Sequence, residues 1–395
     1  MPNQILTGIE VLEQNSFKDF RGEKVGLVCN QGSVTKEAKY TLDLFRQAHK
    51  SGLIELKAIF GPQHGLFGHT QDNMIEWESE QADELTGAPI YSLYGEHREP
   101  TEAMLREIDT LVIDLRDIGA RYYTFIWSTA LCLKACEALG KKVIILDRPN
   151  PLGGIQREGT VLNPKFASFV GLHPLPMRHG LTLGELATHF KTKYYPKVNL
   201  KIVRVLGWQR EELFPETSLL WAMPSPNMPG FEAAMLYPGM CLLEGTNISE
   251  GRGTTKPFEI IGAPYIDGWD LARDLNNLDL RGIYFRPLEF QPTFQKHSGK
   301  ICGGVYIHLT DPAAVQPVRI STAILHQIFK DSNGKAKWNP PPYEYEYVKL
   351  PIDILAGNDW YRPAIESGTP INEIFERMEN ECKTEWDPQD IERLY

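Results

Sequence analysis

The feature of this sequence that most limits its fold is an alternation of short apolar runs with helical patterns over the first part of the chain. Runs rich in β-branched residues predict buried strands at residues 24–30, 55–61, 89–93, 110–115 and 142–147. Helical spacing between these runs predicts helices at residues 37–50, 101–108 and 126–139. Strands separated by helices form parallel βαβ units. We therefore expect an α/β fold with a Rossmann-like, doubly wound, mostly parallel sheet.

A second, smaller α/β region follows the first. The strongest local signal is Thr182 followed by Glu185, a capping box that predicts a helix over residues 182–194. Residues 223–230 contain three prolines, so they fit neither a helix nor a central strand. We place the domain boundary there, with a Rossmann-like N-terminal domain at residues 1–228 and an α/β C-terminal domain at residues 229–395.

The C-terminal region shows fewer regular patterns. A strand is predicted at residues 200–205, before the boundary, and another at residues 305–309. Helices are predicted at residues 319–329 and 371–383. The segment 337–347 is rich in Pro and Tyr and is predicted to be an extended surface loop.

Polar residues gather in the loops that leave the predicted parallel strands. Ligands of doubly wound sheets bind beyond the carboxyl ends of the strands. The candidates in these loops, and before the helix that begins near residue 182, are Asn30, Gln63, His64, Glu96, Asp117, Arg121, Tyr123, Arg148, Asn150 and His179. His64 is a candidate acid or base. Asp117 and Arg121 also fit a simple ion pair, because they are four residues apart.

The richest stretch is residues 244–254, with carboxylates, an amide, an arginine and three glycines. Glu244 and Glu250 are candidate general acid and base, and Arg252 can hold a carboxylate by a bidentate pair. Asn247, and Asn227 in the Pro-rich segment, are candidate substrate-binding amides. The alternative is an ordered loop whose charges pair with each other.

Several chemistries lack their motifs. The loops contain neither GxGxxG nor GxxxxGK[ST], so a dinucleotide or a P-loop nucleotide is not expected. There is no GxSxG elbow for a serine hydrolase. His64 and His69 do not have the spacing of a zinc site. These residues therefore favour neither a bound nucleotide nor a metal site.

The charge balance limits the partners. The formal net charge is -10, which argues against nucleic acid and against electrostatic binding to an anionic membrane. No apolar run is long enough to span a bilayer, and residues 1–8 lack the pattern of a signal peptide. We therefore expect a cytoplasmic protein, or a secreted or periplasmic one if a leader was removed. The six scattered cysteines are expected to be free thiols. The oligomeric state stays open.

A set of ordered motifs resembles the exo-β-N-acetylmuramidase family, formerly a bacterial family of unknown function. The motifs extend over nearly the whole chain and are residues 8–12, 26–31, 62–65, 92–95, 117–124, 146–151, 178–180, 224–229 and 243–257. The resemblance implies a two-domain glycoside hydrolase with its site in the cleft between the domains. It implies release of N-acetylmuramic acid from the non-reducing end of peptidoglycan fragments, a muramyl saccharide substrate, and no cofactor. The lactyl carboxylate of that sugar needs a cation, for which Arg252, Arg121 and Arg148 are candidates in that order.

One position departs from the family pattern. The turn that resembles Pro-Glu-His-Gly has Gln63 in place of the glutamate. An amide neither takes nor gives a proton as a carboxyl does. An alternative function is therefore a catalytically altered protein that binds cell-wall sugars. A second alternative is a metal-dependent hydrolase that uses His64, His69 and nearby aspartates.

Overall fold

A six-stranded parallel sheet forms the centre of the N-terminal part. The computed structural model describes residues 5–72, 74–79, 82–278, 280–386 and 391–395. The strands lie in the order β3-β2-β1-β4-β5-β8, and all neighbouring strands are parallel. Their bounds are β1 (Lys24–Cys29), β2 (Glu55–Gly61), β3 (Ile90–Ser92), β4 (Thr110–Asp114), β5 (Lys142–Leu146) and β8 (Asn199–Val203). The predicted doubly wound parallel sheet is confirmed.

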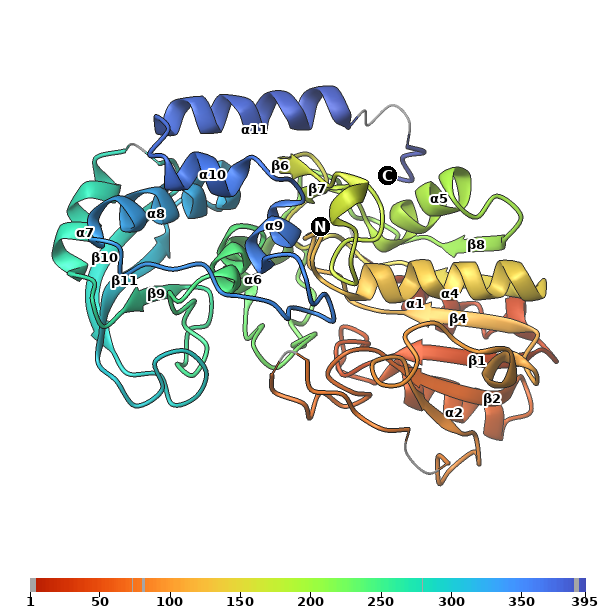
Figure 1. The fold of residues 1–395 in the computed structure, drawn as a ribbon. Coiled ribbons are helices and arrows are strands. Elements are labelled where there is room, and N and C mark those ends of the chain that lie inside the picture. Colours follow the sequence, from red (N-terminus) through yellow and green to blue (C-terminus); the bar gives the residue numbers. More distant parts are fainter. Residues whose placement is uncertain (1–4, 73, 80–81, 279, 387–390) are drawn as a thin grey trace.

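Helices cover both faces of this sheet (Figure 1). They are α1 (Gly8–Gln14), α2 (Thr41–Lys50), α3 (Glu102–Leu105), α4 (Phe125–Leu139) and α5 (Leu183–Lys193). Successive residues of a strand point to opposite faces. In β4, Leu111 and Ile113 join the core beneath α4 and α5, whereas Val112 joins the core beneath α1 and α2. Burial on both faces explains why the strands appear in the sequence as continuous apolar runs.

The predicted capping box fixes the start of α5. The Thr182 hydroxyl accepts a hydrogen bond from the Glu185 backbone N–H at 3.2 Å, and the Glu185 carboxylate accepts one from the Thr182 N–H at 3.0 Å. Each side chain thus satisfies a backbone donor that the first helical turn leaves without a partner.

The C-terminal part contains a smaller antiparallel sheet in the order β10-β11-β9. Its strands are β9 (Ile260–Ala263), β10 (Ile283–Phe290) and β11 (Cys302–Leu309). Its helices are α6 (Phe231–Met240), α7 (Gly268–Asn276), α8 (Pro317–Asp331), α9 (Pro351–Ala356), α10 (Tyr361–Glu366) and α11 (Ile371–Glu385). Short 3-10 helices lie at Lys18–Phe20, Pro164–Phe166, Phe214–Glu216, Cys241–Gly245 and Pro312–Ala314.

One hydrophobic core joins the two parts. It runs from the residues beneath α4, through α6, to α8. No helical pattern marks α6 in the sequence, because this helix is apolar on every side and contains Pro238. The predicted boundary at 228/229 lies just before it. The hairpin of β6 (Glu158–Val161) and β7 (Pro176–Arg178) also contacts the C-terminal part, since α11 packs against β6 (Figure 1).

Two further observations bear on the sequence-based expectations. All six cysteines are buried free thiols, as predicted. Within the residues described, no helix is long and apolar enough to cross a membrane. The first four residues of the amino-terminal segment 1–8 lie outside the described part of the chain.

Candidate active site

A small pocket lies where the loops after β2 and β4 meet the C-terminal part. Gln63 and His64 reach it from the loop after β2, and Tyr123 reaches it from the loop after β4. Arg252 and Glu344 line it from the C-terminal part. The pocket is therefore at the carboxyl edge of the parallel sheet, where the sequence analysis expects a ligand.

The imidazole of His64 has one unprotonated ring nitrogen at neutral pH. Its Nδ1 lies 2.8 Å from the Thr70 carbonyl oxygen. Because a carbonyl only accepts, Nδ1 carries the proton and Nε2 is the acceptor. Burial lowers the pKa of His64 to about 4, although the Thr70 hydrogen bond opposes this. The residue also has a left-handed backbone, with φ 73°, which is uncommon for non-glycine residues.

Gln63 is held in one orientation. Its Oε1 accepts a hydrogen bond from the Thr124 hydroxyl at 2.6 Å. Its Nε2 therefore points to the Tyr94 hydroxyl at 3.1 Å and to Glu344 Oε1 at 3.4 Å. The Tyr94 hydroxyl donates in turn to Glu344 Oε2 at 2.8 Å. The amide of Gln63 is thus a fixed donor to Glu344, a carboxyl group from a distant part of the chain.

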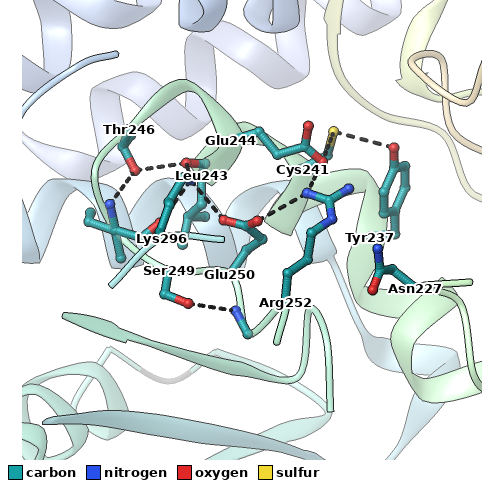
Figure 2. Close-up of polar contacts among 12 residues, drawn as sticks. Asn227, Tyr237, Cys241, Leu243, Glu244, Thr246, Ser249, Glu250, Arg252 and Lys296 are labelled. Atoms are coloured by element: carbon teal, nitrogen blue, oxygen red, sulfur yellow. Dashed lines mark hydrogen bonds and ion pairs between the residues drawn. The ribbon is translucent and has the colours of Figure 1, made fainter. Parts of the chain in front are cut away.

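Arg252 is a buried cation held by two carboxylates (Figure 2). Its Nη1 lies 2.8 Å from Glu244 Oε1 and 3.0 Å from Glu250 Oε1. Burial alone would lower the pKa of Arg252, but the charges of Glu244 and Glu250 outweigh it and raise the pKa well above its usual value. Its Nε finds no hydrogen-bond acceptor among the described residues. A buried donor without an acceptor is unusual, and an anion such as a carboxylate is the partner that a guanidinium prefers.

The other charges of this segment pair with each other, the alternative that the sequence left open. Lys296 Nζ lies 2.7 Å from Glu250 Oε2. Burial alone would raise the pKa of Glu250, but Lys296 and Arg252 outweigh it and lower the pKa to about 2. The Tyr343 hydroxyl donates to Glu244 Oε2 at 2.7 Å. Neither carboxylate lines the pocket, and both are placed to hold Arg252.

The protein's own side chains occupy the crevice at the point where the sheet order reverses, between β1 and β4. Arg148 makes a bidentate ion pair with Asp114, at 2.5 and 2.8 Å, and donates to the Val34 carbonyl. Asn30 Nδ2 donates to the Pro224 carbonyl at 3.0 Å, which ties the Pro-rich segment to the sheet edge. Asn30 and Arg148 are therefore engaged in internal contacts and do not line the pocket.

Five more predicted residues lie away from the pocket. Arg121 is fully buried and donates to the carbonyls of Thr160, Leu175 and Leu355. The remaining four also make internal contacts. Asp117 lies 3.1 Å from His179, Asn150 donates to the Leu181 carbonyl, and Asn247 donates to the Lys335 carbonyl. The expectation that Asp117 pairs with Arg121 is wrong, because the two side chains have different partners.

Two more predicted residues take opposite positions. The side chain of Glu96 is 89 % exposed and does not line the pocket. Asn227 does line the pocket, while its amide group exchanges hydrogen bonds with Gln71 at 2.9 and 3.0 Å. Asn227 thus helps to hold the loop that carries His64.

Tyr343 and Glu344 line the pocket but are not among the residues predicted from the sequence. The expectation of a surface loop over residues 337–347 is wrong for these two, which are 7 % and 3 % exposed, although Tyr347 is exposed. Their burial depends on partners such as Tyr94 that lie far away in the sequence. The available signal was the density of tyrosines, since aromatic side chains favour burial. Thr124, Ser225 and Tyr237 also line the pocket and were not predicted.

A metal centre has no obvious ligands in the described part of the chain. No group of three or more His, Cys, Asp or Glu side chains is placed there to hold an ion. His64 bonds to a backbone carbonyl, and the ring of His69 packs edge-on against Trp77.

Comparison with known proteins gives matches over both parts of the chain. Residues 25–232 match the family model described as "Exo-beta-N-acetylmuramidase NamZ, N-terminal", and residues 235–389 match the corresponding C-terminal model. The chain is 40% identical over 380 residues to the peptidoglycan β-N-acetylmuramidase NamZ of Bacillus subtilis (strain 168). This alignment covers 95% of the chain and 88% of the relative.

Two solved structures have the same architecture. Both are described as DUF1343 family proteins from Bacteroides fragilis NCTC 9343. One has a TM-score of 0.85 at 31% identity and covers 96% of each chain. The other has a TM-score of 0.74 at 27% identity and covers 96% of this chain and 95% of its own.

Proposed function

The chain belongs to the exo-β-N-acetylmuramidase family, and on this premise we propose that it is a glycosidase that releases N-acetylmuramic acid from the non-reducing end of peptidoglycan fragments. The observation that carries the proposal is the pocket in which Arg252 and the neutral imidazole of His64 come together. N-acetylmuramic acid differs from N-acetylglucosamine by a lactyl ether that carries a carboxylate. A pocket for it needs a cation among neutral hydrogen-bonding groups.

Arg252 is the cation that fits this carboxylate. It lines the pocket, it keeps its charge because Glu244 and Glu250 flank it, and its Nε has no acceptor among the described residues. Hydrogen bonds between a guanidinium and a carboxylate are stronger than neutral ones, particularly where water is excluded. We assign Arg252 to substrate recognition, with Glu244 and Glu250 as the groups that position it.

His64 is the base that fits the reaction. Its unprotonated Nε2 can accept a proton from water at neutral pH. Its pKa of about 4 is close to that of the carboxylates that serve as bases in other glycosidases.

A matched pair of substrates tests the proposal. 4-Nitrophenyl N-acetyl-β-muramide and 4-nitrophenyl N-acetyl-β-glucosaminide differ only in the lactyl ether. We expect release of nitrophenol from the first and little from the second. Equal hydrolysis of both would remove the role of Arg252. Binding of the muramide without release would instead support the sugar-binding protein that Gln63 suggests.

A further inference from the structure

Glu344 occupies an unusual position for a carboxyl group. It comes from the segment between α8 and α9, lies 3 % exposed in the wall of the pocket, and contacts the side chain at position 63. Its backbone is left-handed, with φ 44°, as is that of Tyr345, with φ 68°. Backbone strain in a buried segment is kept only where the surrounding structure holds it, and it is concentrated at functional sites.

We propose that Glu344 is the proton donor of the glycosidase reaction and takes the place of the carboxyl group that Gln63 cannot supply. This inference rests on the proposed function. The proton of Glu344 passes to the glycosidic oxygen as the bond from that oxygen to C1 of the muramyl residue breaks, and the oxygen keeps the electron pair. Water forms the new bond to C1, and His64 Nε2 takes its proton, which returns through solvent to Glu344. The products are free N-acetylmuramic acid and the alcohol of the departing fragment.

The hydrogen bonds around Glu344 leave a proton on this carboxyl group without an acceptor in the two neighbouring side chains. Tyr94 donates to Oε2, and Gln63 donates to Oε1 over a longer distance. Tyr94 and Gln63 both donate to the carboxyl group, so neither accepts a proton that Glu344 carries. The Tyr94 oxygen already accepts from Gln63 Nε2 and from the Met74 backbone N–H. A proton on Glu344 is therefore free to move to an oxygen of a ligand in the pocket.

The electrostatic surroundings agree with this role. Burial raises the pKa of Glu344 to about 7, and the charge of Glu244 adds to this, while the hydrogen bonds from Tyr94 and Gln63 and the charge of Arg98 oppose it. Tyr343 is a further titratable neighbour, and burial raises its pKa well above the usual value, so it stays neutral. A pKa near the working pH is the property that general acid catalysis requires.

The first test is Glu344→Gln, assayed on two substrates. On N-acetylmuramyl-β-1,4-N-acetylglucosamine, whose leaving group is a poor one, we expect kcat/KM to fall about 10²- to 10⁴-fold. On 2,4-dinitrophenyl N-acetyl-β-muramide, whose leaving group needs no proton, we expect little loss. Activity on the second substrate also shows that the variant is folded. The basic limb of the pH profile, near pH 7 in the wild type, is expected to disappear with the carboxyl group.

The control is Glu346→Gln. Glu346 lies in the same segment, does not line the pocket, and pairs with Lys349 at 2.8 Å. It should leave both rates and the pH profile unchanged.

The second test exchanges the side chains of Gln63 and Glu344, which contact each other, so that position 63 carries the carboxyl group. The double variant Gln63→Glu/Glu344→Gln should recover part of the activity that Glu344→Gln loses on the disaccharide. If Glu344→Gln turns over the disaccharide as fast as the wild type and with the same pH profile, the inference is overturned, while the proposed function stands. A wild type that binds and never turns over, with an active Gln63→Glu variant, would overturn both.

Discussion

Replacing Glu344 by Gln should stabilise the protein at alkaline pH, and the size of the effect follows from the raised pKa. In the folded protein the pKa of Glu344 is about 7, against a usual value of 4.5. A carboxyl group with a raised pKa binds its proton more tightly in the folded state. The stability associated with it is complete below the unfolded pKa and is lost as the pH rises through the folded pKa. Each pKa unit corresponds to about 1.4 kcal/mol, so the loss reaches ~3 kcal/mol above ~pH 8.

Urea unfolding of the wild type and Glu344→Gln, at ~pH 5 and ~pH 8, measures this effect. Titrations common to both proteins cancel in the difference of their unfolding free energies. We expect that difference to move by ~2–3 kcal/mol in favour of the variant over this range. Glu346→Gln is the control, because the pKa of Glu346 is lowered by its hydrogen bond to Lys349, and any stability that this gives is lost only at acid pH. A difference for Glu344→Gln that is the same at both pH values would refute the claim that this carboxyl is buried and neutral.

Three other predictions concern the cation, its support and metals. Arg252→Lys should lower kcat/KM for the muramide about tenfold to a hundredfold and leave hydrolysis of the glucosaminide unchanged, because one charged hydrogen bond is worth about 1.5–3 kcal/mol. Equal losses on both substrates would contradict the assignment of Arg252 to the carboxylate. Glu250→Gln should lower the free energy of unfolding, measured in urea, by ~3–5 kcal/mol, because it leaves Lys296 without its buried carboxylate partner. Glu379→Gln, in an exposed pair with Lys383, should lower it by at most about 0.5 kcal/mol. Similar values for the two variants would argue against a stabilising buried network. Sugar release should persist after dialysis against a chelator, because the described residues include no cluster of ligands; a loss that an added metal restores would favour the metal-dependent alternative.

Local patterns in the sequence predicted the sheet. Burial on both faces makes β1, β4 and β5 continuous apolar runs. The capping box at Thr182 and Glu185 marked the start of α5. These features depend on neighbours in the chain, so they are visible without a structure. The position of the pocket at the carboxyl edge followed from the parallel order of the strands.

The detail of the site depends on contacts between distant residues. Arg121 and Arg148 lie in the predicted loops, yet one turns to three backbone carbonyls and the other to Asp114. A buried guanidinium takes whatever acceptors the tertiary fold offers, and a sequence does not specify them. Glu344 was missed for the same reason, because Tyr94, its partner, is 250 residues away. Proline and tyrosine beside it are typical of an exposed loop.

The measurement that tests the central claim most directly is the release of N-acetylmuramic acid from N-acetylmuramyl-β-1,4-N-acetylglucosamine by the wild type beside Gln63→Glu. We predict turnover by the wild type, since Glu344 supplies the carboxyl group that position 63 lacks. A wild type that binds the disaccharide without turnover, together with an active Gln63→Glu variant, would contradict it and mark the protein as a sugar-binding member of its family.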